Sequence, residues 1–109
     1  MVNVGTLRRR IRIEQATTSA DAYGEPIKIW GVLDQVSAEV LPLTVSEQFR
    51  AQQINREITL KMHIHYRADV TELMRILYDG DYYDIHGITE VGFREGLELL
   101  VGLAKPEGA

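Results

Sequence analysis

The sequence predicts a mostly β domain: a small antiparallel β-barrel or sandwich of six to eight short strands with one short inserted α-helix. Between Arg56 and Tyr66, apolar and polar residues alternate without a break, as in a strand with one buried and one exposed face. Asp79-Gly80 separates two β-rich segments and favours a type I′ hairpin turn. One capping-box sequence, Thr44-Val45-Ser46-Glu47, predicts the single helix.

Size and composition are those of one globular domain covering residues 1–109, with 45% hydrophobic and 26% charged residues. No apolar stretch approaches the roughly 20 residues of a membrane span, so we expect neither export nor a membrane partner. The chain has no cysteine, which excludes disulfides, a thiolate nucleophile and cysteine-bound zinc and suits a reducing cytoplasm. The net charge of −4 argues against a general nucleic-acid binder.

The first strand is expected over Leu7 to Gln15, and one of its faces is cationic through Arg8, Arg10 and Arg12. Residues 16–26 lack an apolar period and end in Gly24-Glu25-Pro26, which predicts an exposed loop. Two further strands are expected over 27–33 and 35–41, the second ended by Pro42.

The helix is expected from Thr44 to about Gln53, with Val45, Phe49 and the stem of Gln53 on one narrow apolar face. A helix this short is only marginally stable alone, so it must pack against the sheet or against another subunit. Asp69 can begin one helical turn that reaches Leu73.

The remaining elements are two strand pairs and a tail. The first pair, 75–78 and 82–88, flanks the Asp79-Gly80 turn. The second pair, 90–94 and 97–103, flanks Glu95-Gly96, and residues 104–109 are expected to be a flexible tail.

The sequence contains few residues in patterns typical of metal binding or catalysis. His63 and His65 share a strand face and His86 could join them as metal ligands, but no spaced carboxylate completes a set, so we interpret them as surface histidines. Asp79 and Asp81 fit a tight turn better than a catalytic pair. With no nucleophile elbow or phosphate-binding loop, we expect no enzyme activity and no catalytic, cofactor or metal site.

Two groups of side chains have open interpretations. The arginine face can oppose accidental pairing of an edge strand, or it can meet acidic groups of a neighbouring subunit or DNA phosphates. The aromatic residues can pack in the core or form a base-stacking platform; they are Trp30, Tyr66, Tyr78, Tyr82 and Tyr83. A small β-barrel module that binds single-stranded nucleic acid or a peptide is therefore the alternative function.

The order of features along the chain resembles tailed-bacteriophage head-tail joining proteins, also called head-completion, adaptor or stopper proteins. The resemblance rests on residues spread over most of the chain: Leu7-Arg8, Arg10-Ile11, Ile13, Asp21, Gly24, Trp30, Ala38, Val40, Pro42-Leu43, Glu47, Ala51, Ile64, Tyr66-Arg67, Asp69-Val70, Arg75, Tyr78, Gly80, Tyr83 to Ile85 and Leu97. Ser37 and His65 depart from the family pattern, which often has tryptophan and arginine there.

The resemblance implies a structural virion protein at the head-tail connector, made in the bacterial host cytoplasm. Its copies would form a ring of six or twelve subunits that extends or closes the DNA exit channel below the portal and provides the tail attachment surface. The implied partners are further copies of the chain, a portal or adaptor protein, a tail or tail-terminator protein, and the packaged double-stranded DNA.

The segments with the weakest demand for burial within one subunit are the best candidates for contacts with neighbours. They are the loop from Thr17 to Glu25 and the capped segment from Thr44 to Asn55. The expected interface residues are Thr17, Asp21, Tyr23, Gly24, Thr44, Glu47, Arg50, Gln53 and Asn55, with Arg8, Arg10 and Arg12 as channel or interface arginines.

Overall fold

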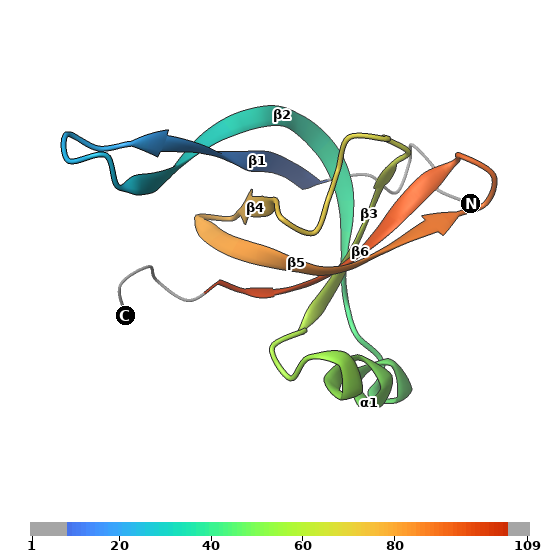
Figure 1. Ribbon diagram of the computed structural model, residues 1–109. Coiled ribbons are helices and arrows are strands. Elements are labelled where there is room, and N and C mark those ends of the chain that lie inside the picture. The colour runs from blue at the N-terminus through green and yellow to red at the C-terminus, as the bar shows by residue number, and fades with distance from the viewer. Residues whose placement is uncertain (1–8, 105–109) are drawn as a thin grey trace.

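A computed structural model describes residues 9–104 of the chain, which form a closed β-barrel. The elements in chain order are β1 (Arg9–Ala20), β2 (Pro26–Pro42), α1 (Val45–Ile54), β3 (Leu60–His65), β4 (Arg75–Tyr78), β5 (Asp81–Val91) and β6 (Gly96–Leu103). Neighbouring strands are antiparallel, and the order around the barrel is β1-β2-β3-β6-β5-β4 (Figure 1). The predicted small antiparallel barrel with one inserted helix is confirmed.

The two longest strands continue beyond the barrel as a two-stranded ribbon, which we call the arm (residues 15–32; Figure 1). β4 pairs with β1 only over Arg12 to Glu14, so beyond that point β1 has β2 as its partner. The prediction of a loop over 16–26 is wrong: residues 16–20 are paired strand, and only 21–25 form the loop. Apolar alternation is missing there because most of the arm's side chains stay exposed on both faces.

A β-bulge lies where the arm leaves the barrel. Ile13 pairs with Asp34 and Glu14 pairs with Val32, so Leu33 is the extra residue in β2. Extra residues of this kind bend a strand and increase its twist without ending it. The two strands predicted over 27–33 and 35–41 are therefore one strand, which the bulge lets serve both the arm and the barrel.

The barrel interior is filled by alternate residues of the strands. The largest fully buried side chains there are Ile11, Ile13, Met62, Ile64, Ile76, Leu99 and Val101. A second, small cluster of Leu43, Ala51 and Ile58 lies under α1. The alternation predicted from the sequence is confirmed at Met62 and Ile64. The strand β3 is shorter than predicted, with six residues, because the chain first makes a turn after the helix. A hydrogen bond from the Glu57 N–H to Asn55 Oδ1 (2.8 Å) holds this turn.

The other predicted elements are partly confirmed. The Asp79-Gly80 hairpin is present, and both residues have the positive φ of a type I′ turn (53° and 84°). The helical turn expected at Asp69 is wrong, because this segment forms non-helical turns. The strand expected over 90–94 is also wrong: β5 runs on to Val91, and residues 92–95 make the turn.

The two ends of the chain are described only in part. Residues 7 and 8 of the predicted first strand and residues 105–109 of the predicted tail lie outside the described residues. The last described residue, Ala104, donates its N–H to the carbonyl of Tyr82 (2.8 Å). Within residues 9–104, no helix has the length and apolar character that crossing a membrane requires.

Candidate functional site

The tip of the arm carries three of the expected interface residues, Asp21, Tyr23 and Gly24, in a loop that its own hydrogen bonds hold in shape. Asp21 Oδ1 accepts from the N–H groups of Tyr23 (2.8 Å) and Glu25 (3.0 Å). Gly24 has φ 81°, a left-handed conformation that glycine adopts without strain. Thr17 lies further back on β1, with its hydroxyl donating to the Ile29 carbonyl at 3.5 Å. The loop therefore presents Tyr23, which is 92% exposed, on a fixed backbone.

The arm also exposes apolar side chains along its length. Ile27, Ile29 and Val32 are all large hydrophobic residues with about half of their surface in solvent. A two-stranded ribbon on its own is at best marginally stable in water, and it gains stability by packing against something else. Exposed apolar residues on such a ribbon therefore mark a surface suited to contact with another protein.

An ion pair buried at the root of the arm joins it to the barrel. Glu14, whose side chain is 6% exposed, accepts on Oε1 from Arg75 Nε (2.9 Å) and Nη2 (2.8 Å). The Arg75 guanidinium lies against the rings of Trp30 (4.2 Å) and Tyr82 (3.8 Å). The sequence analysis missed this cluster, since Glu14 and Arg75 are 61 residues apart and neither sits in a recognisable motif.

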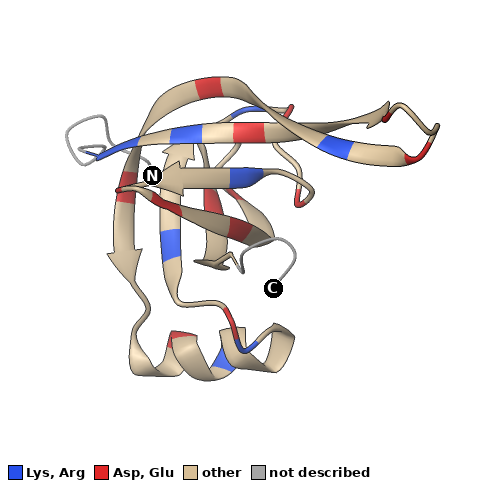
Figure 2. Ribbon diagram, turned by 90° about the vertical axis from the view of Figure 1, so that its left-hand side faces the viewer, with Lys and Arg blue, Asp and Glu red and all other residues tan. Residues whose placement is uncertain are grey.

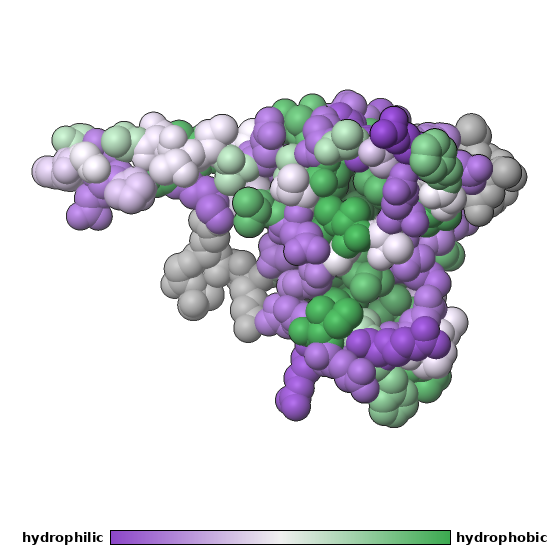
Figure 3. Space-filling model, turned by 45° about the vertical axis from the view of Figure 1, so that its right-hand side comes forward, coloured by the Kyte–Doolittle hydropathy of each residue, from purple (hydrophilic) through white to green (hydrophobic). Residues whose placement is uncertain are grey.

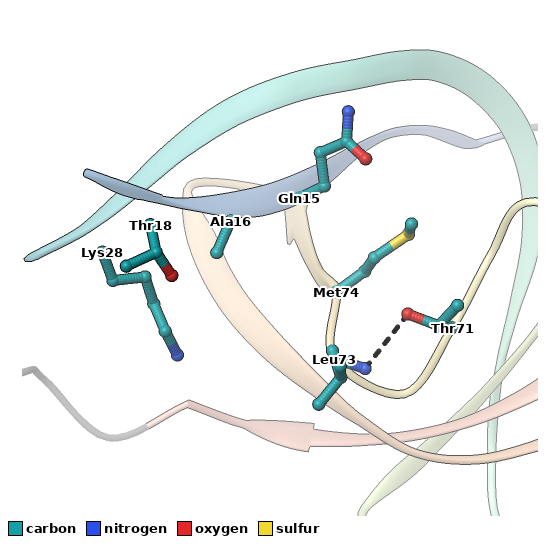
Figure 4. Close-up of a pocket in the computed structure, with 7 residues that line it drawn as sticks. All are labelled: Gln15, Ala16, Thr18, Lys28, Thr71, Leu73 and Met74. Carbon is teal, nitrogen blue, oxygen red and sulfur yellow. Dashed lines mark hydrogen bonds between the residues drawn. The ribbon is translucent and has the colours of Figure 1, made fainter. Parts of the chain in front are cut away.

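A hollow of about 360 Å³ lies under the arm, between its lower face and the turn before β4. Figure 4 shows Ala16, Thr18 and Lys28 on the arm facing this space, with Leu73 and Met74 on the other side. The Leu73 N–H is held by the Thr71 hydroxyl at 3.3 Å. The lining mixes polar and apolar atoms without converging charged groups, so the hollow has the character of a gap between two elements and shows no catalytic arrangement.

The start of α1 is fixed by the predicted capping box. Thr44 Oγ1 accepts from the Glu47 N–H (3.3 Å), and Glu47 Oε1 accepts from the Thr44 N–H (3.0 Å). Glu47 also receives a hydrogen bond from Lys61 on β3, which ties the helix to the sheet. Hydrogen bonds from Lys61 first and Thr44 second lower the pKa of the Glu47 carboxyl to about 2. Thr44 and Glu47 thus act within the subunit.

The end of α1 is held in a similar way. Asn55 donates its N–H to the Ala51 carbonyl (2.9 Å), and its side-chain amide nitrogen lies 3.2 Å from His86 Nδ1 on β5, which accepts. Arg50 and Gln53 stay exposed, and neither forms an ion pair with another residue of 9–104. Of the five candidates on this segment, these two remain available for contacts outside the subunit.

The apolar face predicted for α1 points away from the barrel. Val45 is 71% exposed and Phe49 is 70% exposed, while Ala51 is the residue that packs on the sheet. The helix packs on the barrel through the small Ala51, which lies against Leu43 and Ile58, while most of its predicted apolar face stays exposed. Hydrophobic side chains gather along the flank of the barrel and at the helix in the space-filling view (Figure 3).

The arginine face predicted on the first strand is only partly present. Arg8 lies outside the described residues, and Arg10 is exposed, with Nη1 3.4 Å from the Ser37 hydroxyl. Arg12 pairs with the buried Glu14 at 3.5 Å, so part of its charge is compensated inside the subunit. The edge-strand interpretation is wrong at Arg12, because β1 pairs there with both β2 and β4.

The histidines take part in hydrogen bonds within the sheet. His63 bridges three strands, with Nδ1 3.2 Å from Glu39 and Nε2 2.9 Å from Glu98. His65 is exposed, and His86 contacts Asn55 as described above. Across residues 9–104, no three His, Asp or Glu side chains are arranged to hold a metal ion.

Arg67 joins the barrel to the turns that follow β3. Its guanidinium donates to Asp69 (2.9 Å twice) and to Asp34 (2.7 Å) at the bulge in β2. These hydrogen bonds raise the pKa of Arg67 and lower the pKa of both carboxyls. The role of Arg67 was not predicted, and the structure shows that it ties Asp69 to Asp34 of β2.

The aromatic residues pack inside the subunit more than they face solvent. Tyr66, Tyr78 and Tyr83 lie against the barrel core, and the rings of Tyr78 and Tyr83 are 6.3 Å apart. Trp30 and Tyr82 flank the Arg75 guanidinium. The interpretation as core-packing residues is confirmed for Tyr66, Tyr78 and Tyr83, whereas Trp30 and the 37% exposed Tyr82 pack on Arg75 outside the core.

The structure thus separates the expected interface residues into two groups. One group sits at the tip of the arm and the other on α1, and the two lie well apart in both ribbon views (Figures 1 and 2). Charged residues of both signs are spread over the barrel, and acidic residues mark the arm tip (Figure 2). This arrangement places two groups of exposed candidate residues on different sides of one small barrel.

Comparison with known proteins finds relatives in sequence and in fold. The head completion protein gp7 of Enterobacteria phage HK97 is 28% identical over 72 residues, which span 66% of this chain and 64% of that protein. The solution structure of protein SF1141 from Shigella flexneri 2a superposes with a TM-score of 0.79 and 26% identity, covering 94% of this chain and 96% of that one.

A chain from the virion of a native gene transfer agent particle shares the fold, with a TM-score of 0.63 at 17% identity and coverage of 90% and 96% of the two chains. The family model described as phage head completion protein matches residues 2–103, nearly the full sequence. On the strength of that match, this chain belongs to the phage head completion protein family.

Proposed function

We propose that the chain is a structural virion protein of the head-tail interface, where copies form a ring of six or twelve subunits below the portal. The ring would extend or close the DNA exit channel and offer the surface to which the tail attaches. The observation that carries this proposal is the match of residues 2–103 to the head completion family. The likeness to gp7 of phage HK97 supports it over the 64% of that protein that is aligned.

The distribution of exposed apolar side chains supports assembly as the activity. Large hydrophobic residues are exposed on the arm (Tyr23, Ile29) and on the helix (Val45, Phe49), at separate places on the molecule. Two different surfaces on one chain allow head-to-tail contacts, which close into a ring when the rotation between copies permits it. Closure pairs the strands on both sides within the barrel, whereas the two strands of the arm pair only with each other and each keeps one open edge.

The charged groups support a structural role in another way. Buried or half-buried ionisable groups such as Glu14, Glu47 and His63 are engaged by partners inside the subunit. A net charge of −4 also suits a channel component, because each phosphate that a protein neutralises adds to its grip on DNA. Partners at the two faces of the ring would be a portal or adaptor protein and a tail or tail-terminator protein.

The test is the removal of the chain from the phage that encodes it, with the intact gene supplied in trans as the control. Electron microscopy should show heads that lose DNA or lack tails, and complementation should restore tailed, filled particles. Mass spectrometry of those particles should find the chain. Filled, tailed and infectious particles made in its absence would refute the proposal.

A further inference from the structure

We infer that neighbouring copies join by docking the arm tip of one subunit into a pocket beside α1 of the next, with Tyr23 inserted and Glu25 facing Arg50. The inference rests on the proposed ring and names the contact that would hold it together. It is carried by four observations: a rigid aromatic knob, a pocket that fits a ring, complementary charge, and the separation of the two surfaces.

The aromatic knob is Tyr23, and the loop that carries it is held in one conformation before any contact forms. The tip is closed by two backbone bonds, from Asp21 N–H to the Glu25 carbonyl (2.9 Å) and from Gly24 N–H to the Asp21 carbonyl (3.0 Å). The Asp21 carboxylate fixes two further N–H groups of the loop. Docking of Tyr23 therefore costs little loop ordering, which is the main entropic penalty when a flexible loop binds.

The pocket lies between α1 and the sheet and has a volume of about 160 Å³. Its walls are apolar, formed by Leu43, Ala51, Ile54 and Leu100, and its rim carries Glu47, Arg50 and Glu98. A cavity of roughly 150 Å³ lined by aliphatic residues is large enough to bind benzene. The pocket thus matches the ring of one aromatic side chain, and Ile54, which is 68% exposed, would gain cover from it.

The charges at the rim select which aromatic residue fits. Glu47 is bonded to Lys61, and Glu98 is bonded to His63, so both acids already have partners. Arg50 is the cation at the rim of the pocket, and it forms no ion pair with any residue of 9–104. Glu25, two residues from Tyr23 at the tip, would bring the opposite charge to it.

Phe93 is the other candidate for insertion into the pocket, but the charge next to it does not complement the pocket rim. Phe93 is 87% exposed at the turn after β5, but Arg94 follows it, and the Arg94 guanidinium lies 5.8 Å from the Phe93 ring. Inserting Phe93 would place Arg94 next to Arg50, and like charges brought together at an interface are destabilising. Charge complementarity therefore favours the arm tip.

The distance between the arm tip and α1 requires that the contact form between two copies of the chain. The arm tip and α1 lie far apart within one chain and face different sides (Figures 1 and 2), so a subunit cannot fill its own pocket. A knob on one surface and a pocket on another give a heterologous contact, in which every copy uses both surfaces. Repeating that contact produces a ring when the rotation between copies closes.

The absence of cysteine from the chain permits a direct cross-linking test in purified particles. The variant Ala22→Cys/Gln53→Cys keeps Tyr23 and Ile54 intact and places one thiol beside the knob and one beside the pocket. Treatment with a short bismaleimide should give a ladder of covalent multimers. The matched control Glu72→Cys/Gln53→Cys, whose position 72 is also exposed but lies on another loop, should stay monomeric.

Further substitutions in the cross-linking variant test the residues themselves. Tyr23→Ser should abolish the ladder, whereas Phe93→Ser should leave it intact. Glu25→Arg or Arg50→Glu alone should reduce cross-linking severalfold, and the two together should restore it.

The outcomes separate this inference from the proposed function. If the chain is present in particles and the ladder is missing, or is as strong in the Glu72→Cys control, the arm-to-helix contact is refuted while the virion role stands. If Tyr23→Ser leaves the ladder unchanged, the knob is refuted. If the chain is absent from particles, the proposed function fails, and the inference falls with it.

Discussion

Replacing Arg75 with methionine should destabilise the whole domain, because it strips the partner from a buried carboxylate. Glu14 is 6% exposed and would lose both hydrogen bonds on Oε1, leaving Arg12 at 3.5 Å as the one cation in contact among residues 9–104. Breaking a buried pair from one side costs roughly 3–5 kcal/mol. Since Arg12 compensates part of the charge, we expect a loss of about 3 kcal/mol in the free energy of unfolding.

The assay is equilibrium unfolding in urea followed by far-UV circular dichroism, with Trp30 fluorescence as a second probe. A loss of that size corresponds to a fall of roughly 12 °C or more in Tm for a domain of about this length. The double variant Glu14→Met/Arg75→Met removes both charges and should recover most of the stability, since an apolar pair leaves nothing uncompensated. A loss below about 1 kcal/mol for Arg75→Met, or a double variant as unstable as the sum of the two single ones, would refute the reasoning.

Three further results are expected from the isolated protein. Leu99→Ala, in the centre of the barrel, should cost about 2–5 kcal/mol in urea unfolding through the cavity it leaves. Glu47 has a folded-state pKa of about 2 against an ordinary 4.5, so the stability from its ionised form is complete above about pH 4.5 and is lost as the pH falls toward 2; thermal melts of Glu47→Gln should lack this part of the acid dependence. Gly102→Ala should prevent folding, as judged by circular dichroism, because its Cβ would lie 2.0 Å from the Glu57 carbonyl oxygen, whereas Gly31→Ala, with open space around it, should fold normally.

Local rules predicted the elements whose causes are local. The capping box at Thr44 and Glu47 and the turn at Asp79-Gly80 depend on residues within four positions of each other, and both are present as expected. The alternation through Met62 and Ile64 identified buried positions correctly, because a strand in a barrel has one face inside. The number and type of these elements predicted a barrel or a sandwich, and the pairing of β1 with β4 closes the sheet into a barrel.

Features that depend on distant partners escaped prediction. The arm is paired strand without a buried face, so residues 16–20 carry no apolar period and were expected to be a loop. Glu14 and Arg75 meet only because β1 and β4 are neighbours in the closed sheet. The outward direction of Phe49 on α1 was likewise decided by Ala51, whose small side chain fits against the sheet where a ring would not.

The unbroken course of β1 and β2 from barrel to arm has a mechanical consequence. No flexible joint separates the two parts: the bulge at Leu33 bends the ribbon, while Glu14, Arg75 and Trp30 clamp its root. A sideways load applied at Tyr23 is therefore transmitted as shear to the β1–β4 pairing, which spans three residue pairs. The resistance of the arm to bending is therefore set by these three residue pairs. Tension between adjoining parts of an assembly would strain the β1–β4 pairing first.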